Sequence, residues 1–205
     1  MEELRPGLWT WTASHPAWDG PHHDWGPVVR SYALEAPDAL VLFDPLEPPA
    51  DLLERADGRR LAVIVTLFEH ERSAGPLAER AGAEVFAPAA GLGRMAAAAT
   101  GYAVGDRLPG DVRACTGFWP DEATLWIEAH RALVTGDVLL GEPELRLQPD
   151  DWIEEGASTF GPTTADDVRA GLRPLLDLPV ELVLPTHGDP VVEDAAAALR
   201  GALEA

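Results

Sequence analysis

The chain has 205 residues, of which 35 are acidic and 15 are basic, for a formal net charge of −20. This length is enough to bury a sizeable core, and a hydrophobic fraction of 46% is typical of a globular protein rather than a disordered one. Phosphate backbones repel so acidic a surface, and the arginines are scattered, so we expect no nucleic-acid partner.

Membrane and redox classes are also disfavoured by the sequence. No apolar run approaches the ~20 residues that span a bilayer, and residues 1–5 lack the basic and then apolar layout of a signal peptide. We therefore expect a cytoplasmic protein with no membrane partner. The single cysteine, Cys115, excludes an internal disulfide and a Cys-rich zinc site.

The first half of the chain alternates strand and helix signals. Residues 28–34 and 39–43 are apolar-rich runs separated by Glu-Ala-Pro-Asp, which predicts a hairpin. The continuous apolar run 61–67 predicts a strand covered on both faces. Three helices are predicted in this half, at residues 49–56, 71–81 and 89–100, and a further strand at 84–87.

After Gly105 the pattern changes to short strands followed by helices. Successive antiparallel strands are predicted at residues 112–116, 124–128 and 132–135. Residues 164–177 predict a helix with acidic residues in its first turn, where the helix dipole favours them. A last strand and a last helix are predicted at 181–185 and 193–203. Residues 141–163 show no clear pattern, and a loop of that length is usually functional or mobile.

Both halves thus place strands before helices, which predicts an α/β fold. We expect a four-layer α/β/β/α sandwich in which helices cover two packed sheets. No linker or low-complexity boundary interrupts the chain, so residues 1–205 are interpreted as a single domain.

The most informative stretch is residues 63–75, Val-Ile-Val-Thr-Leu-Phe-Glu-His-Glu-Arg-Ser-Ala-Gly. It predicts a buried strand that runs into a helix with polar groups at the junction. It resembles the T-H-x-H-x-D-H-x-x-G signature of the metallo-β-lactamase superfamily, which places metal ligands where a strand ends. Thr66 and Gly75 match that signature. Its ligand positions are occupied by Leu67, Glu69, Glu71 and Arg72.

Three later segments extend the resemblance over nearly the whole chain. Residues 116–120, Thr-Gly-Phe-Trp-Pro, stand where the family has P-G-H-T-P, so Phe118 takes a histidine position. Residues 132–139 are similar to the family's L-F-T-G-D-T-L segment, and residues 182–188 to its V-x-P-G-H-G segment. The resemblance therefore implies the metallo-β-lactamase fold and retains Asp137 and His187, which as a pair have the chemistry of a general base.

The resemblance also implies that the usual dinuclear zinc centre is lost, so we expect no bound metal. Leu67 and Phe118 offer no ligand atom. A guanidinium cannot ligate a metal but can replace its charge. We expect Arg72 to pair with Asp137, with Glu69 or Glu71 nearby. The alternative is that Arg72 points into solvent.

A relocated site for zinc or another divalent metal is a further alternative. Its donors would come from His70, Glu69, Glu71, Asp137 and His187. The N-terminal segment 15–25 adds His22 and His23, and in the family this part of the chain runs beside the active-site mouth. The simpler interpretation is that this segment only caps the sheet.

The pocket residues that we expect come from these same segments. They are Glu69, His70, Glu71, Arg72, Phe118, Trp119, His22 and His23. Aromatic residues in loops beside a pocket, such as Trp119 and Trp152, suggest an apolar or aromatic ligand; ordinary loop packing is the alternative.

Three functions remain open from the sequence. The first is a hydrolase-like protein without the dinuclear site, which binds a small molecule or retains residual hydrolysis. The second is a metal-dependent hydrolase with a rearranged or mononuclear site that acts on an ester, thioester or lactam. The third is a structural or interaction protein, in which Leu67 and Phe118 fill the former metal cavity. A homodimer is compatible with all three.

Overall fold

The computed structural model describes residues 1–20 and 25–204, and two large sheets form its centre. In the first sheet seven strands follow one another in chain order. They are β1 (Glu2–Arg5), β2 (Leu8–Ser14), β3 (Val28–Glu35), β4 (Ala39–Phe43), β5 (Arg60–Ile64), β6 (Glu84–Pro88) and β7 (Thr100–Tyr102). The strands from β1 to β4 are antiparallel to their neighbours, whereas β4 to β7 run parallel.

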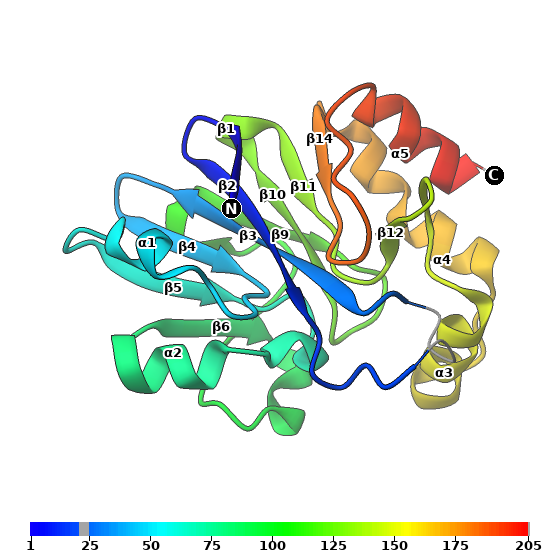
Figure 1. The fold of residues 1–205 in the computed structure, drawn as a ribbon. Coiled ribbons are helices and arrows are strands. Elements are labelled where there is room, and N and C mark those ends of the chain that lie inside the picture. Colours follow the sequence, from blue (N-terminus) through cyan, green and yellow to red (C-terminus); the bar gives the residue numbers. More distant parts are fainter. Residues whose placement is uncertain (21–24, 205) are drawn as a thin grey trace.

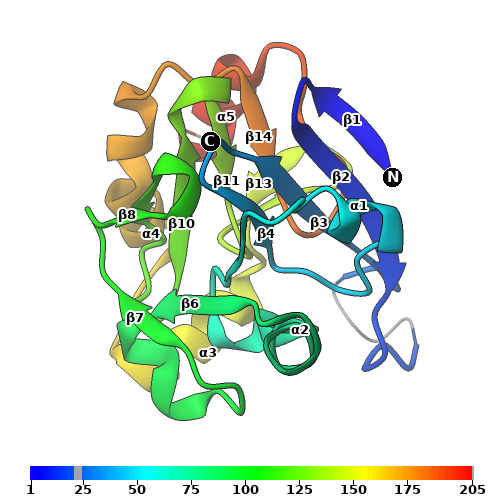
Figure 2. The same ribbon diagram turned by 90° about the vertical axis from the view of Figure 1, so that its left-hand side faces the viewer.

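The second sheet has the strand order β14-β11-β10-β9-β8. Its strands are β8 (Arg107–Leu108), β9 (Val112–Thr116), β10 (Ala123–Ile127), β11 (Ala132–Val134) and β14 (Leu182–Leu184). A separate two-stranded ribbon is formed by β12 (Leu139–Gly141) and β13 (Leu145–Leu147). Figure 2 shows β8 and β10 on one side of the molecule and β1 and β2 on the other.

Helices cover the outer faces of both sheets. They are α1 (Ala50–Glu54), α2 (Ala74–Ala81), α3 (Asp150–Phe160), α4 (Ala165–Leu172) and α5 (Ala195–Glu204). Five short 3₁₀ helices lie between them: η1 (Phe68–Glu71), η2 (Ala89–Arg94), η3 (Pro109–Asp111), η4 (Glu128–His130) and η5 (Arg173–Asp177). In Figure 1, α1 and α2 lie on one side of the sheets and α4 and α5 on the other.

The alternation of side chains along the strands explains this layering. In β4, Val41 and Phe43 point into the core between the sheets, whereas Leu40 and Leu42 pack on the opposite face with Leu52 of α1. All of these side chains are fully buried. A strand buried on both faces has to be apolar throughout, which is the pattern that the sequence shows.

The second sheet is covered in the same way. Leu125 of β10 faces the core between the sheets, while the neighbouring Trp126 packs on the outer face with Val168 of α4 and Leu199 of α5. The predicted α/β/β/α sandwich is therefore confirmed. Of the described helices, none is long and apolar enough to cross a membrane.

The parallel strands determine where a site can form. β4 runs parallel to β5 in the first sheet, and β11 runs parallel to β14 in the second. The carboxyl ends of parallel neighbours lie at the same edge of a sheet, so the loops after these strands meet at one end of the sandwich. Figures 1 and 2 place α2 and α3 at the same end of the molecule.

Two sequence predictions of secondary structure were wrong. Residues 89–100 were predicted as one helix but form the 3₁₀ helix η2 and the start of β7. Gly91 and Gly93 weaken a helix there, and Gly101 approaches Leu92 so closely that a Cβ atom would lie 2.9 Å from Leu92 Cδ1.

The second error concerns residues 141–163, which were predicted to lack structure. They contain β13 and α3. Helix α3 has no side-chain hydrogen bond at its N-cap and carries Gly156 in its interior, so the usual signals for a helix are weak there. The predicted helix 71–81 begins later, at Ala74, because Arg72 adopts a positive φ of 41°.

The core between the sheets provides a test of this arrangement. Phe43 is fully buried there, so Phe43→Ala is expected to lower the free energy of unfolding by about 3–5 kcal/mol. The matched control is Val104→Ala, because Val104 is 64% exposed and its truncation should change stability by less than about 0.5 kcal/mol. Urea unfolding measures both. Equal effects of the two substitutions would contradict the packing described here.

Candidate metal centre

Asp44 and Thr66 form the base of the site at the ends of β4 and β5. The backbone N–H of Thr66 donates to Asp44 Oδ1 at 2.8 Å, and the Thr66 hydroxyl donates to Asp44 Oδ2 at 2.6 Å. Both residues are fully buried. A buried carboxylate is tolerated only when it is hydrogen-bonded in this way, so Asp44 is a fixed acceptor beneath the site.

His70 lies between two carboxylates. Its side chain comes from η1, directly after β5, and only 4% of the residue is exposed. His70 Nδ1 lies 3.1 Å from Asp44 Oδ2, and His70 Nε2 lies 3.1 Å from Asp137 Oδ1. Asp44 therefore fixes the orientation of the ring and directs Nε2 toward Asp137.

Asp137 also joins His70 to His187, which follows β14. The distance from His187 Nε2 to Asp137 Oδ1 is 3.4 Å, and the Thr186 hydroxyl donates to the same oxygen at 3.1 Å. One carboxylate oxygen thus faces two imidazole Nε2 atoms. The rings of Trp25 and Trp152 meet His187 edge-on at centroid distances of 5.4 and 6.0 Å.

The charges of this cluster shift its pKa values strongly. Burial and the Arg72 charge lower the pKa of His70, but the Asp137 and Asp44 carboxylates outweigh them and raise it to about 9. For Asp137, burial raises the pKa, yet the charges and hydrogen bonds of His70 and His187 hold it well below its usual range. Without a metal ion, His70 and Asp137 form an ion pair at neutral pH.

Glu122 provides a second buried carboxyl group beside the cluster. It is 5% exposed, and its Oε1 accepts the backbone N–H groups of Asp137 and Val138, both at 2.9 Å. Burial raises the pKa of Glu122 well above its usual value, and the Asp137 charge adds to this. Glu122 therefore fixes the loop that carries Asp137.

Arg72 does not form the expected ion pair with Asp137. Its Nη1 donates instead to the backbone carbonyls of Asp44 and Arg30, at 2.9 and 3.3 Å. The positive φ of Arg72 turns its side chain inward, so the alternative in which it points into solvent is not observed either. Nε and Nη2 are buried, and no described residue bonds to them. His70 occupies the place beside Asp137.

A cavity of about 350 Å³ opens over this cluster. Its walls include Leu67, Glu69, His70, Arg72, Asp137 and His187. A packed core at this position would have excluded such a cavity. Trp119 and Trp152 also line it, with Trp152 on α3 rather than in a loop.

Two of the predicted pocket residues lie elsewhere. The Glu71 carboxylate accepts the backbone N–H groups of Ala96 and Ala97, at 2.8 and 2.7 Å, and so turns away from the cavity. Phe118 packs against Gly171 of α4, where a Cβ atom would lie 2.5 Å from its ring. Neither lines the cavity, because each finds a better partner on a neighbouring element.

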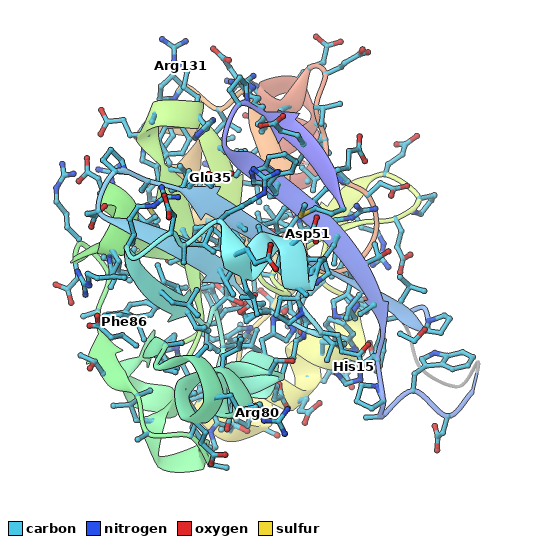
Figure 3. The ribbon with its side chains drawn as sticks, turned by 60° about the vertical axis from the view of Figure 1, so that its left-hand side comes forward. His15, Glu35, Asp51, Arg80, Phe86 and Arg131 are labelled. Carbon is cyan, nitrogen blue, oxygen red and sulfur yellow. The ribbon has the colours of Figure 1, made fainter. Side chains whose placement is uncertain are left out.

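The N-terminal segment reaches the same end of the molecule. His15, which follows β2, lines the cavity and meets the ring of Trp25 edge-on at 5.0 Å. Figure 3 shows His15 at the opposite end of the molecule from Arg131. The predicted pocket residues His22 and His23 lie outside the described residues.

The donor atoms of the cluster fit one metal ion. In the described part of the chain, His70, Asp137 and His187 are the group whose ligand atoms all lie within 4.8 Å of one another. With bonds of about 2.0–2.1 Å, the edge of a tetrahedral zinc site is about 3.3 Å long. The two Asp137 distances, 3.1 and 3.4 Å, are close to such edges. Two imidazoles and one carboxylate suit zinc or iron(II).

Comparisons with solved structures agree with this architecture. The structure of TMB-1 superposes with a TM-score of 0.70 at 14% identity, covering 99% of this chain and 95% of that one. The structure of a metallo-beta-lactamase from Pontibacter korlensis superposes with a TM-score of 0.67 at 14% identity, covering 99% of this chain and 97% of that one. The structure of TTHA1623 in a di-iron-bound form superposes with a TM-score of 0.65 at 19% identity, covering 93% of this chain and 96% of that one.

No protein-family model and no curated protein matches the chain. At these identities the structural matches establish the fold alone. The chain therefore has the metallo-β-lactamase fold over nearly its full length. Within that fold, its described residues hold a His-Asp-His cluster formed by His70, Asp137 and His187.

Sequence reasoning did not identify Asp44 or Glu122 as parts of the site, and it placed Trp152 beside the pocket in a loop rather than on a helix. Asp44 directly follows the predicted strand 39–43, but its hydrogen bond to His70 depends on the fold. Glu122 precedes β10 without any motif. A polar residue at the end of a buried strand was the one available signal.

The raised pKa of His70 predicts how stability depends on pH in metal-free protein. The His70 charge stabilises the folded protein fully at pH values below the pKa of His70 in the unfolded chain, which is about 6.5. This stabilisation is lost as the pH rises through the pKa of His70 in the folded protein, which is about 9. The stability advantage of the wild type over His70→Gln, measured by urea unfolding in chelator, should therefore fall by the order of 3 kcal/mol across this window.

A control substitution separates this effect from general pH sensitivity. Burial lowers the pKa of His130, so His130→Gln should not show a loss that begins above neutral pH. If His70→Gln does not fold, NMR titration of the His70 ring replaces the comparison. A His70 pKa near 6.5 in the folded protein would contradict the ion pair.

Proposed function

We propose that this protein is a metal-dependent hydrolase with a mononuclear site, acting on a small-molecule ester, thioester or lactam. The observation that carries the proposal is the convergence of His70 Nε2 and His187 Nε2 on one oxygen of Asp137. Asp44 supports it, since a carboxylate behind a histidine ligand fixes the ring and raises its basicity.

Three side chains favour one ion over two. Leu67 offers no ligand atom, and Glu71 is engaged by backbone N–H groups away from the cavity. Arg72 supplies a positive charge that acts on Asp44 and Asp137, where a second cation would otherwise balance the carboxylates. The guanidinium opposes a second metal ion by charge repulsion.

The chain's own groups have defined tasks in this proposal. His70, Asp137 and His187 hold the ion, Asp44 orients His70, and Glu122 holds the Asp137 loop through two backbone N–H groups. A bound ion would lower the pKa of a water molecule toward about 7 and polarise a carbonyl group. Glu69 lines the cavity, where its carboxylate can accept a proton.

The cavity supports a small-molecule substrate. Its volume of about 350 Å³ lies in the range of ligand sites, roughly 300–1,000 Å³. Its lining combines aromatic rings with many acidic and basic side chains, so it suits a ligand that has both an apolar part and a polar or charged part.

A second candidate function is metal-free binding of a small molecule. The observation that favours it is that His70 already lies 3.1 Å from both Asp44 and Asp137. This arrangement balances the buried charges without an ion. The two candidates differ in one measurable property, the metal content of the purified protein.

The metal content provides the first test. Protein exposed to zinc or iron(II) and then desalted should retain about one ion per chain by elemental analysis. His187→Ala and Asp137→Ala should each lose it. Glu71→Gln is the matched control and should retain it, because Glu71 lies away from the cavity. Two retained ions, or none, would contradict a mononuclear site.

Asp44 allows a test of the support beneath the ligands. Asp44→Asn keeps the shape of the side chain but removes its charge, so metal affinity should fall about 10- to 100-fold. Competition with a chromophoric chelator measures the affinity. Thermal unfolding checks that the variant is folded, and an unchanged affinity in folded protein would remove Asp44 from the site.

A further inference from the structure

We propose that the cavity selects substrates that carry a quaternary or alkylated ammonium group on an apolar or aromatic moiety, and that it rejects anionic substrates. This inference rests on the proposed function, because it names the substrate class of the same site. It is carried by the balance of charge in the cavity and by the aromatic rings that share its walls.

The cavity is acidic beyond its metal cluster. Outside that cluster and Glu122, whose pKa burial raises well above its usual value, the lining includes the carboxylates of Glu69, Asp121 and Glu155 and the guanidinium group of Arg94. Arg94 is already bonded to Asp121. Glu69 and Glu155 then remain without a guanidinium partner, so the field in this part of the cavity favours a cation over an anion.

Two of these carboxylates are open to a ligand. Glu69 comes from η1 and Glu155 from α3, so they approach the cavity from different elements. In the described part of the chain no ion pair is formed by either one. Because both carboxylates line the same cavity, a single cation between them would be attracted by both.

Aromatic rings supply the apolar part of the subsite. Trp119 and Phe160 stack at a centroid distance of 5.8 Å, and Phe160 remains 42% exposed at the cavity. Trp152 lies on the same helix as Glu155. The faces of such rings attract ammonium groups, and alkylated ammonium ions are bound by this combination of rings and carboxylates.

The cavity already contains one contact of this kind. The Arg94 guanidinium lies over the ring of Phe68, 3.7 Å from its centroid. Both residues line the cavity. A cation is thus already held on an aromatic face in this cavity, and a ligand cation would find further ring surface at Trp152 or at the partly exposed Phe160.

The subsite adjoins the metal cluster. The Trp152 ring meets the His187 ring edge-on, at a centroid distance of 6.0 Å. A group bound against Trp152 and Glu155 therefore lies beside His187 and the other proposed metal ligands. An ester or amide whose leaving group or acyl group carries the ammonium would place its carbonyl near Asp137. Binding energy from the cation would thus orient the bond to be hydrolysed.

The test uses binding to metal-stripped protein, so that it does not depend on catalysis. By calorimetry, phenyltrimethylammonium should bind at least about tenfold more tightly than benzoate, since cation–π contacts and charge both favour it. Glu155→Gln should weaken phenyltrimethylammonium binding about three- to tenfold. Glu154→Gln is the matched control on the same helix, because Glu154 is exposed and does not line the cavity.

The outcomes separate this inference from the proposed function. Benzoate binding as tight as that of phenyltrimethylammonium, no binding of the cation, or equal effects of Glu155→Gln and Glu154→Gln would overturn the ammonium subsite. Cation binding without any metal uptake would overturn the mononuclear hydrolase and leave the subsite standing.

A matched pair of esters completes the experiment in metal-loaded protein. The trimethylammonio and tert-butyl groups have the same shape, so 4-(trimethylammonio)phenyl acetate and 4-tert-butylphenyl acetate are matched in size but differ in charge. The ammonium group also makes its phenol a better leaving group, so each kcat/KM value is first divided by the rate constant for hydroxide hydrolysis of the same ester. We expect kcat/KM to favour the cationic ester by about tenfold, and by less in Glu155→Gln. Equal kcat/KM values would overturn the inference while supporting hydrolysis.

Discussion

The site depends on one interaction, the placement of the His70 imidazole between the Asp44 and Asp137 carboxylates. Asp44 follows a strand of the first sheet and Asp137 follows a strand of the second, so the histidine joins the two layers at one end of the sandwich. Because the ring is buried, its charge state is coupled to both carboxylates. The same geometry that forms an ion pair in the metal-free protein presents two Nε2 atoms and one oxygen to a metal ion.

Charge balance explains why the rest of the site has its present form. A buried group of carboxylates needs cations, which can be metal ions, imidazolium groups or guanidinium groups. This chain places Arg72 beneath the cluster and His70 within it, so that at most one further cation is needed. The outer cavity differs, because Glu69 and Glu155 have no such partner there among the described residues. We therefore expect a metal ion beside His70 and Asp137 and a ligand cation beside Glu69 and Glu155.

Much of the fold could be predicted from the sequence, but less of the site. The apolar runs of β4 and β5 and the order of the motifs were sufficient for the four-layer arrangement, because burial of strands on both faces leaves a strong pattern. Helix α3 was missed because it has no side-chain N-cap and contains Gly156, so its beginning and its interior lack the usual helix signals. By their positions in a motif, Glu71 was assigned to the cavity and Arg72 to an ion pair with Asp137. A local backbone turn at Arg72 and a hydrogen-bonding loop at 96–97 gave these two side chains other partners.

By itself the sequence determined the layers, the strand ends that carry polar residues, and the retention of Asp137 and His187. Those features follow from hydrophobic periodicity and from local motifs, which depend on neighbours in the chain. Only the tertiary structure decided that His70 lies between Asp44 and Asp137, that Glu122 holds the Asp137 loop, and that α3 closes the cavity with Trp152. These contacts join residues that are far apart in the sequence, and their geometry depends on how the two sheets pack rather than on any local pattern.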